Sequence, residues 1–230
     1  MTRVERPSPN HDDRGGASVD ILLIHYTGMA SGAAALERLC DPAARVSAHY
    51  AIDEDGTLYA LVPETRRAWH AGIAYWAGAR DINARSIGIE LVNPGHEFGY
   101  RAFPEAQIGT LTQLCGEILR RHAIAPWRVL GHSDVAPARK DDPGELFPWA
   151  RLAAAEIGLW PLLGEDPGAA AVPDLLARYG YDPDAPLEKA VTAFQRHFRP
   201  SRVDGMADRE TRELLCGLVA LYDARKGERA

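Results

Sequence analysis

The sequence predicts an α/β domain with a central mixed sheet flanked by helices, followed by a small all-α domain of three helices. Two observations lead to this prediction. Strand-like apolar runs alternate with helix-like runs through roughly residue 160, which is typical of an α/β fold. Beyond a stretch rich in glycine and proline, the remaining patterns are all helical. A chain of 230 residues is long enough for one well-buried domain and a smaller one.

We expect four segments along the chain. Residues 1–18 are polar and should form an irregular lead-in, and residues 19–160 should form the α/β domain. Residues 161–172 contain two prolines and two glycines, which predicts a linker. Residues 173–223 should form the helical domain, with helices at 173–179, 187–198 and 208–223.

Five runs predict the strands. Residues 19–26 are apolar and rich in branched side chains, as in a buried strand. Residues 47–53 and 57–62 flank Asp55-Gly56 and predict a hairpin. Further strands are expected at 86–92 and 128–131.

Helices are expected between these strands. Ser31 is a candidate cap for a helix over 31–40. Pro104 suits the first turn of a helix over 104–122, and a closing helix is expected at 148–157. The apolar positions of the 104–122 helix recur at helical spacing: Ile108, Leu111, Leu114 or Cys115, and Ile118.

Composition excludes several classes of function. The net charge of −6 argues against general nucleic-acid binding, which requires a basic face. No apolar run is long enough for a membrane span, and the N-terminus lacks the apolar segment of a secretory signal, so we expect a cytoplasmic protein. The three cysteines are far apart in the sequence and are expected to be buried, reduced thiols: Cys40, Cys115 and Cys216.

The stretch from Gly131 to Gly144, GHSDVAPARKDDPG, carries the strongest chemical signal. Its two prolines disfavour helix, so His132 and Asp142 can fold back toward a common point. Imidazole nitrogen and carboxylate oxygen are zinc ligands. The alternative is a surface loop in which His132 faces solvent and Asp142 caps a turn.

His25 is the candidate third ligand, because it also ends a strand, and functional groups converge at strand ends in α/β sheets. The alternative is a histidine packed at a strand end. His49 and His70 lie beside aromatic residues, and we expect them to have structural or cleft-wall roles rather than to bind metal.

Glu90 points from an otherwise apolar strand, on the face opposite Ile89. A buried carboxylate needs either a cation or a catalytic purpose, and here it could serve as general base and then general acid. The alternative is an ion pair with Arg85 or Arg139. Lys140 could stabilise the oxyanion of a tetrahedral intermediate, whereas the alternative is a solvated lysine. Together with zinc, these groups predict hydrolysis of an amide.

Five motifs in this order resemble the zinc-dependent N-acetylmuramoyl-L-alanine amidases of the amidase-2 type, the AmpD/AmiD-like family. The motifs are His25-Tyr-Thr, Val46-Ser-Ala-His-Tyr, Trp69-His-Ala-Gly, Ser86-Ile-Gly-Ile-Glu-Leu and the 131–144 stretch. The resemblance implies a fold like that of peptidoglycan recognition proteins and phage T7 lysozyme. It also implies cleavage between the lactyl group of N-acetylmuramic acid and L-alanine.

By position, the resemblance implies that His25, His132 and Asp142 bind one zinc ion. It implies that Glu90 is the catalytic carboxylate and that Lys140 stabilises the oxyanion. The sequence matches the family pattern at all five positions.

The C-terminal part is similar to a three-helix peptidoglycan-binding domain. The runs that carry this resemblance are 187–196 and 203–211, with Leu214. Asp204-Gly205 should form a turn before a cap at Asp208. Whatever the function, four residues are expected in the core of the bundle: Leu187, Val191, Phe194 and Leu214. Binding to the cell wall is implied by the resemblance alone.

Three functions remain open from the sequence. The first is an amidase acting on peptidoglycan or anhydromuropeptides. The second is a protein that recognises these molecules without cutting them, which would not need the full ligand set. The third is a zinc hydrolase of another amide. A cytoplasmic enzyme would act on recycled muropeptides, whereas the implied wall-binding module suggests the envelope or periplasm instead. We expect a monomer.

Overall fold

A six-stranded mixed sheet organises the first part of the chain. In this computed structural model, which describes residues 2–228, the strand order is β1-β5-β4-β7-β3-β8. Strands β4 and β5 are antiparallel, as the expected hairpin requires, and the other neighbouring pairs are parallel. The predicted mixed sheet is therefore confirmed. Its strands are β1 (Arg3–Glu5), β3 (Ile21–Tyr26), β4 (Tyr50–Ile52), β5 (Leu58–Ala60), β7 (Ser86–Leu91) and β8 (Val129–Gly131).

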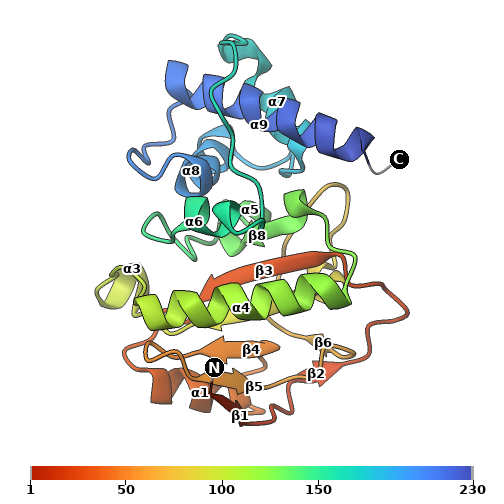
Figure 1. Cartoon of the computed structure of the whole chain (residues 1–230), viewed down its shortest axis with the longest axis vertical. Coiled ribbons are helices and arrows are strands. Elements are labelled where there is room, and N and C mark those ends of the chain that lie inside the picture. Colours follow the sequence, from red (N-terminus) through yellow and green to blue (C-terminus); the bar gives the residue numbers. More distant parts are fainter. Residues whose placement is uncertain (1, 229–230) are drawn as a thin grey trace.

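Helices flank this sheet. The long helix α4 (Glu105–Arg121) lies across it, and α1 (Gly32–Cys40) follows β3 (Figure 1). The Ser31 hydroxyl accepts a hydrogen bond from the Ala34 N–H at 3.2 Å, so Ser31 caps α1 as predicted. The closing helix α6 (Trp149–Ala154) is shorter than expected. The remaining helical turns are α2 (Ile82–Arg85), α3 (Gly95–Phe98), α5 (His132–Val135) and η1 (Pro126–Arg128).

Two expectations about local structure were wrong. The lead-in 1–18 is not entirely irregular, because β1 pairs with β5 and β2 (His11–Asp12) pairs with β6 (Arg67–Ala68). These strands are two or three residues long and polar, so only their pairing partners define them. The 131–144 stretch also contains one helical turn, α5, because its prolines follow this turn rather than interrupt it.

Alternation along β3 sends its side chains into two separate cores. Leu22 and Ile24 pack with apolar residues of β7 and α4. The apolar positions predicted for α4 are all buried. Ile21 and Leu23 face the other side, where they join a core that includes Phe194 of the helical part. His25 has the same parity as Leu23 and therefore belongs to this second side.

The C-terminal part is helical, as expected, with α7 (Val172–Tyr179), α8 (Leu187–Phe198) and α9 (Arg209–Gly227) preceded by the short η2 (Ala169–Ala171). Asp208 caps α9 through the Thr211 N–H at 3.0 Å, as predicted. Val191 and Phe194 are buried, but Leu187 is 45% exposed because it occupies the first position of α8. Leu214 is only half-buried, and its neighbour Leu215 fills the core instead.

The helical part packs directly onto the α/β part. One apolar core runs from Leu23 and Leu130 of the sheet to Tyr179, Phe198 and Leu218 of the helices. In Figure 1 the helices α7, α8 and α9 lie beyond α5 and α6, at the end of the molecule opposite the N-terminus. The two parts therefore share one apolar core and do not form independent domains joined only by a linker.

Two findings concern the cysteines and membrane association. All three cysteines are free; Cys115 is buried as expected, whereas Cys40 and Cys216 are only half-buried. Between residues 2 and 228, no helix combines the length and apolarity needed to cross a bilayer.

Candidate functional site

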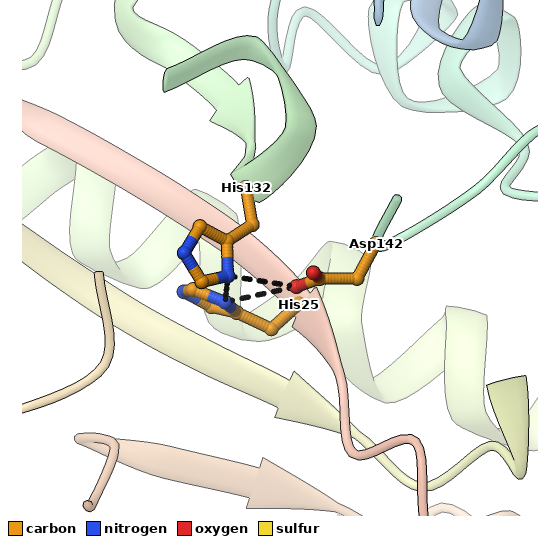
Figure 2. A group of neighbouring side chains, drawn as sticks. All are labelled: His25, His132 and Asp142. Atoms are coloured by element: carbon orange, nitrogen blue, oxygen red, sulfur yellow. Dashed lines mark hydrogen bonds and ion pairs between the residues drawn. The ribbon is translucent and has the colours of Figure 1, made fainter. Parts of the chain in front are cut away.

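Three side chains from distant parts of the chain converge at one end of the sheet (Figure 2). His25 lies near the C-terminal end of β3, His132 opens α5, and Asp142 lies on the loop that follows. The Nδ1 atoms of the two histidines are 2.9 Å apart, and each lies 3.1 Å from Asp142 Oδ2. All three residues are buried. The structure thus brings together the three residues that the sequence selected.

This triangle of atoms fits a metal ion. Zinc binds nitrogen and oxygen ligands at about 2.0–2.1 Å in a tetrahedron, which places neighbouring ligand atoms about 3.3 Å apart. The observed separations of 2.9–3.1 Å are close to this value. Burial, with the neighbouring His132, lowers the pKa of His25 to about 4, so this imidazole is neutral at neutral pH and available as a ligand. The group can therefore hold a metal ion through Nδ1, Nδ1 and a carboxylate oxygen.

Glu90 lies directly beside this group. It pairs in register with His25 across the β3–β7 ladder, so both side chains leave the same face of the sheet. Glu90 Oε2 is buried and forms no hydrogen bond among the described residues. Burial, reinforced by Asp142 and opposed by Lys140, raises its pKa well above the ordinary value.

The ion pairs considered for Glu90 are not formed. Arg85 pairs with Asp20, and Arg139 donates to the carbonyl oxygens of Ala71 and Ile73 at 2.7 and 2.8 Å. Among residues 2–228, Glu90 is therefore a carboxyl group without an ion-pair partner at the edge of a metal-type site.

Lys140 lines the same cavity. This cavity of about 200 Å³ is bounded by Glu90, Lys140, His132 and Asp142, with Trp69 and His70 on its wall. Within residues 2–228 the Lys140 ammonium has no hydrogen-bond or ion-pair partner. Its charge is therefore free to interact with a molecule in the cavity.

His49 and His70 occupy the structural positions expected of them. His49 Nδ1 accepts the Gly88 N–H at 2.9 Å, and His70 forms part of the cavity wall. The His70 ring lies against β7 so closely that a Cβ at Gly88 would come within 2.5 Å of it. The glycine in the Ser86-Ile-Gly-Ile-Glu-Leu motif thus makes room for this ring.

The sequence did not reveal how the helical part supports the site. Asp134, in α5, accepts hydrogen bonds at 2.7 Å from the Gly131 N–H, Tyr181 Oη and His197 Nδ1. Arg196 of α8 pairs with Asp141 at 2.8 Å, beside Asp142. These contacts join residues far apart in the sequence, which no local pattern can show.

Two family models match this chain. Residues 15–145 match the N-acetylmuramoyl-L-alanine amidase family, and residues 166–215 match a putative peptidoglycan binding domain. The first match contains all five predicted site residues. The second covers residues 166–172 of the predicted linker and most of the helical part.

Similar proteins agree with these matches. N-acetylmuramoyl-L-alanine amidase AmiD of Escherichia coli is 41% identical, over 89% of this chain and 83% of AmiD. 1,6-Anhydro-N-acetylmuramyl-L-alanine amidase AmpD of Citrobacter freundii is 33% identical, over 64% of this chain and 87% of AmpD.

Solved structures share the fold. The complex of E. coli AmiD with anhydro-N-acetylmuramic acid-L-Ala-D-γ-Glu-L-Lys has a TM-score of 0.81 at 38% identity, covering 90% of this chain and 92% of AmiD. AmpDh3 from Pseudomonas aeruginosa has a TM-score of 0.82 at 33% identity, covering 95% and 96%. With a family match that includes the whole site and relatives aligned over nearly the full chain, this protein belongs to the N-acetylmuramoyl-L-alanine amidase family.

Proposed function

We propose that the protein is a zinc-dependent amidase that hydrolyses the bond between the lactyl group of N-acetylmuramic acid and L-alanine. The observation that carries this proposal is the geometry of one cavity. It places three converging metal-type ligand atoms beside a buried carboxyl group and a lysine, neither of which has an ion-pair partner in the described part of the chain. Membership of the amidase family supports the choice of substrate bond.

His25, His132 and Asp142 would hold the zinc ion. Two imidazoles and one carboxylate are a typical catalytic zinc set, because three protein ligands leave a fourth position for water or substrate. When bound, zinc supplies a Lewis acid that polarises the amide carbonyl and lowers the pKa of water.

Glu90 and Lys140 would supply the remaining chemistry. Glu90 accepts a proton from the attacking water and delivers a proton to the leaving amine of L-alanine. Lys140 places a positive charge where the carbonyl oxygen becomes negative, and its ammonium has no competing partner among the described residues.

Anhydromuropeptides are the proposed substrates, in cell-wall turnover and recycling. AmiD and AmpDh3 structures carry anhydromuramyl peptides, and both align with this chain over at least nine tenths of its length. The cytoplasmic location expected from the sequence, with the envelope as its alternative, stays a prediction that cell fractionation can test. The monomeric state likewise stays a prediction, which size-exclusion chromatography with light scattering can test.

Residues 173–223 are proposed to bind peptidoglycan or its fragments. The match of residues 166–215 to a putative peptidoglycan binding domain supports this role. A pull-down of the Glu90→Ala variant, in which we expect strongly reduced turnover, with insoluble peptidoglycan tests it with little cleavage of the ligand. Retention in the supernatant would contradict the proposed binding.

The amidase proposal is tested by mass spectrometry on a defined 1,6-anhydromuropeptide, before and after chelation and after addition of zinc. We expect release of the free stem peptide, its loss on chelation and its return with zinc. Release only from intact peptidoglycan would assign the enzyme to the sacculus instead. Binding of both molecules without cleavage of either would favour the recognition-protein alternative.

A further inference from the structure

A continuous hydrogen-bond chain leads from His25 to the backbone of α2. His25 Nε2 lies 3.0 Å from His70 Nδ1, and His70 Nε2 lies 3.2 Å from Ser86 Oγ. The Ser86 hydroxyl in turn lies 2.6 Å from the carbonyl oxygen of Ile82. The three side chains are at most 9% exposed, so these bonds are largely shielded from bulk water.

The last member of the chain fixes its direction. A carbonyl oxygen can only accept, so Ser86 donates to Ile82 and its oxygen is left to accept from His70 Nε2–H. His70 Nδ1 then carries a lone pair and accepts from His25 Nε2–H. His25 Nδ1 is consequently unprotonated, and it is this atom that faces His132 and Asp142.

Ala71, which follows His70 in the sequence, fixes the tautomer of the second histidine, His132. His132 Nε2 has two neighbours, the carbonyl oxygen of Ala71 at 3.0 Å and Arg139 Nη2 at 3.4 Å. The carbonyl oxygen is the nearer and can only accept, so in the neutral ring Nε2 carries the proton and Nδ1 is unprotonated. The side-chain oxygen of Asn83 accepts the backbone N–H groups of both His70 and Ala71, at 3.0 and 2.8 Å. Asn83 thus holds the backbone of His70 and Ala71, which in turn accept hydrogen bonds from His25 and His132.

We propose that His70, Ala71, Ser86 and Asn83 are the positioning group of the metal site, which presets both imidazoles in the tautomer that binds metal through Nδ1. The inference rests on the proposed metal site and deepens it. In these tautomers the three atoms, which lie 2.9–3.1 Å apart, would all be acceptors with no proton between them until a cation binds. The positioning group maintains this arrangement, because it keeps the proton of His25 on Nε2 and so prevents an Nδ1–H hydrogen bond to Asp142.

Two substitutions of one residue separate positioning from packing. His70→Leu keeps an apolar side chain of similar bulk but removes the acceptor for His25 Nε2–H. His70→Asn restores an acceptor, because its side-chain oxygen can take the place of Nδ1. Ser86→Ala, a smaller change, removes only the group that directs the His70 tautomer.

Two measurements on the purified full-length proteins then test the proposal. Long-range ¹H–¹⁵N correlation spectra of the metal-free proteins report which nitrogen of each histidine carries the proton. Competition with a chromophoric chelator reports the zinc affinity.

We expect His25 and His132 to be protonated at Nε2 in the wild type. His70→Leu should shift His25 toward the Nδ1–H form, hydrogen-bonded to Asp142, with His132 unchanged, and should weaken zinc binding roughly 10–100-fold. His70→Asn should restore both properties, and Ser86→Ala should change them in the same direction as His70→Leu but by less.

Unchanged tautomer and zinc affinity in a folded His70→Leu protein would overturn the proposal. Weaker zinc binding with His25 still protonated at Nε2 would also overturn it, because His70 would then act only by packing. Failure of the wild type to bind zinc would refute the metal site itself. That failure can be distinguished from failure of the positioning proposal, because the tautomers are measured in the metal-free protein.

Discussion

His25 and Asp142 reach the same site from two differently supported regions. His25 lies on β3, an inner strand with β7 on one side and β8 on the other, so sheet hydrogen bonds fix its backbone. Asp142 lies on the loop that follows α5, outside any strand or helix. Arg196 of α8 pairs with Asp141 of this loop, and His197 of α8 binds Asp134 of the preceding helix α5.

The difference shows that the site depends on both parts of the chain. The strand side carries His25 and Glu90, whose relative position follows from the register of β3 and β7. The loop side carries His132, Lys140 and Asp142, on α5 and the loop after it, and both of these segments contact α8. We therefore infer that the C-terminal helices stabilise α5 and this loop in addition to any binding that they perform.

Removal of one functional group from each side should have the largest effect. His132→Ala should abolish both zinc binding and turnover, because it removes a ligand. Glu90→Ala should keep zinc and lower turnover roughly 10²–10⁴-fold, because it removes only the proton-transfer group. Metal analysis and single-turnover assays of the two variants measure the contrast. Equal zinc loss in both would contradict the assignment of Glu90 as a non-ligand.

Loss of the buried carboxylate that joins the two parts should come next. Asp134→Ala leaves the donors of Gly131, Tyr181 and His197 unpaired in the core, which should lower the free energy of unfolding by about 2–4 kcal/mol. Urea denaturation measures this change. Asp166→Ala, which removes an exposed partner of Arg212, is the control and should have little effect.

Weakening of the loop support alone should have a smaller effect. Arg196→Ala removes the ion pair to Asp141, next to Asp142, and should weaken zinc binding about five-fold, as expected of a contact of about 1 kcal/mol. Chelator competition measures this change. Arg212→Ala is a matched control, because its side chain is similarly buried and its ion pair lies within the C-terminal part. An equal effect in both variants would refute a local role for Arg196.

The smallest expected effect is the contribution of Glu90, on the strand side, to the pH dependence of the free energy of unfolding. The raised pKa of Glu90 means that the unfolded state releases this proton above pH about 4.5, while the folded metal-free protein retains it. The wild type therefore loses stability as pH rises from about 4.5, toward the raised pKa. The charge of Asp142 opposes the ionisation of Glu90, and the charge of Lys140 favours it. The effect of Asp142 on the pKa of Glu90 is the larger of the two.

Glu90→Gln removes this pH-dependent loss. We expect the metal-free variant to be about 1 kcal/mol more stable than the wild type at pH 7 and to differ little at pH 4. Thermal unfolding at the two pH values measures the difference. A variant that is less stable at pH 7 would show that the ionised carboxylate is stabilised in the folded protein.

The sequence by itself determined the main elements and the chemistry of the site. Apolar runs and helical spacing identified β3, β7, α4 and α8, because each of these patterns is local. Side-chain chemistry and the resemblance of five motifs selected five residues: His25, Glu90, His132, Lys140 and Asp142. In the structure the last four line one cavity, and His25 joins His132 and Asp142 beside it.

Only the tertiary structure decided which groups support that site. His70 meets His25 across 45 residues, and Asp134 meets His197 across 63, so no local pattern links them. The carbonyl oxygen of Ala71 is a backbone atom, which leaves no trace in residue identity. Ligands are specified by side-chain chemistry and can be read from the sequence, whereas their orientation depends on backbone acceptors and distant partners that exist only after folding.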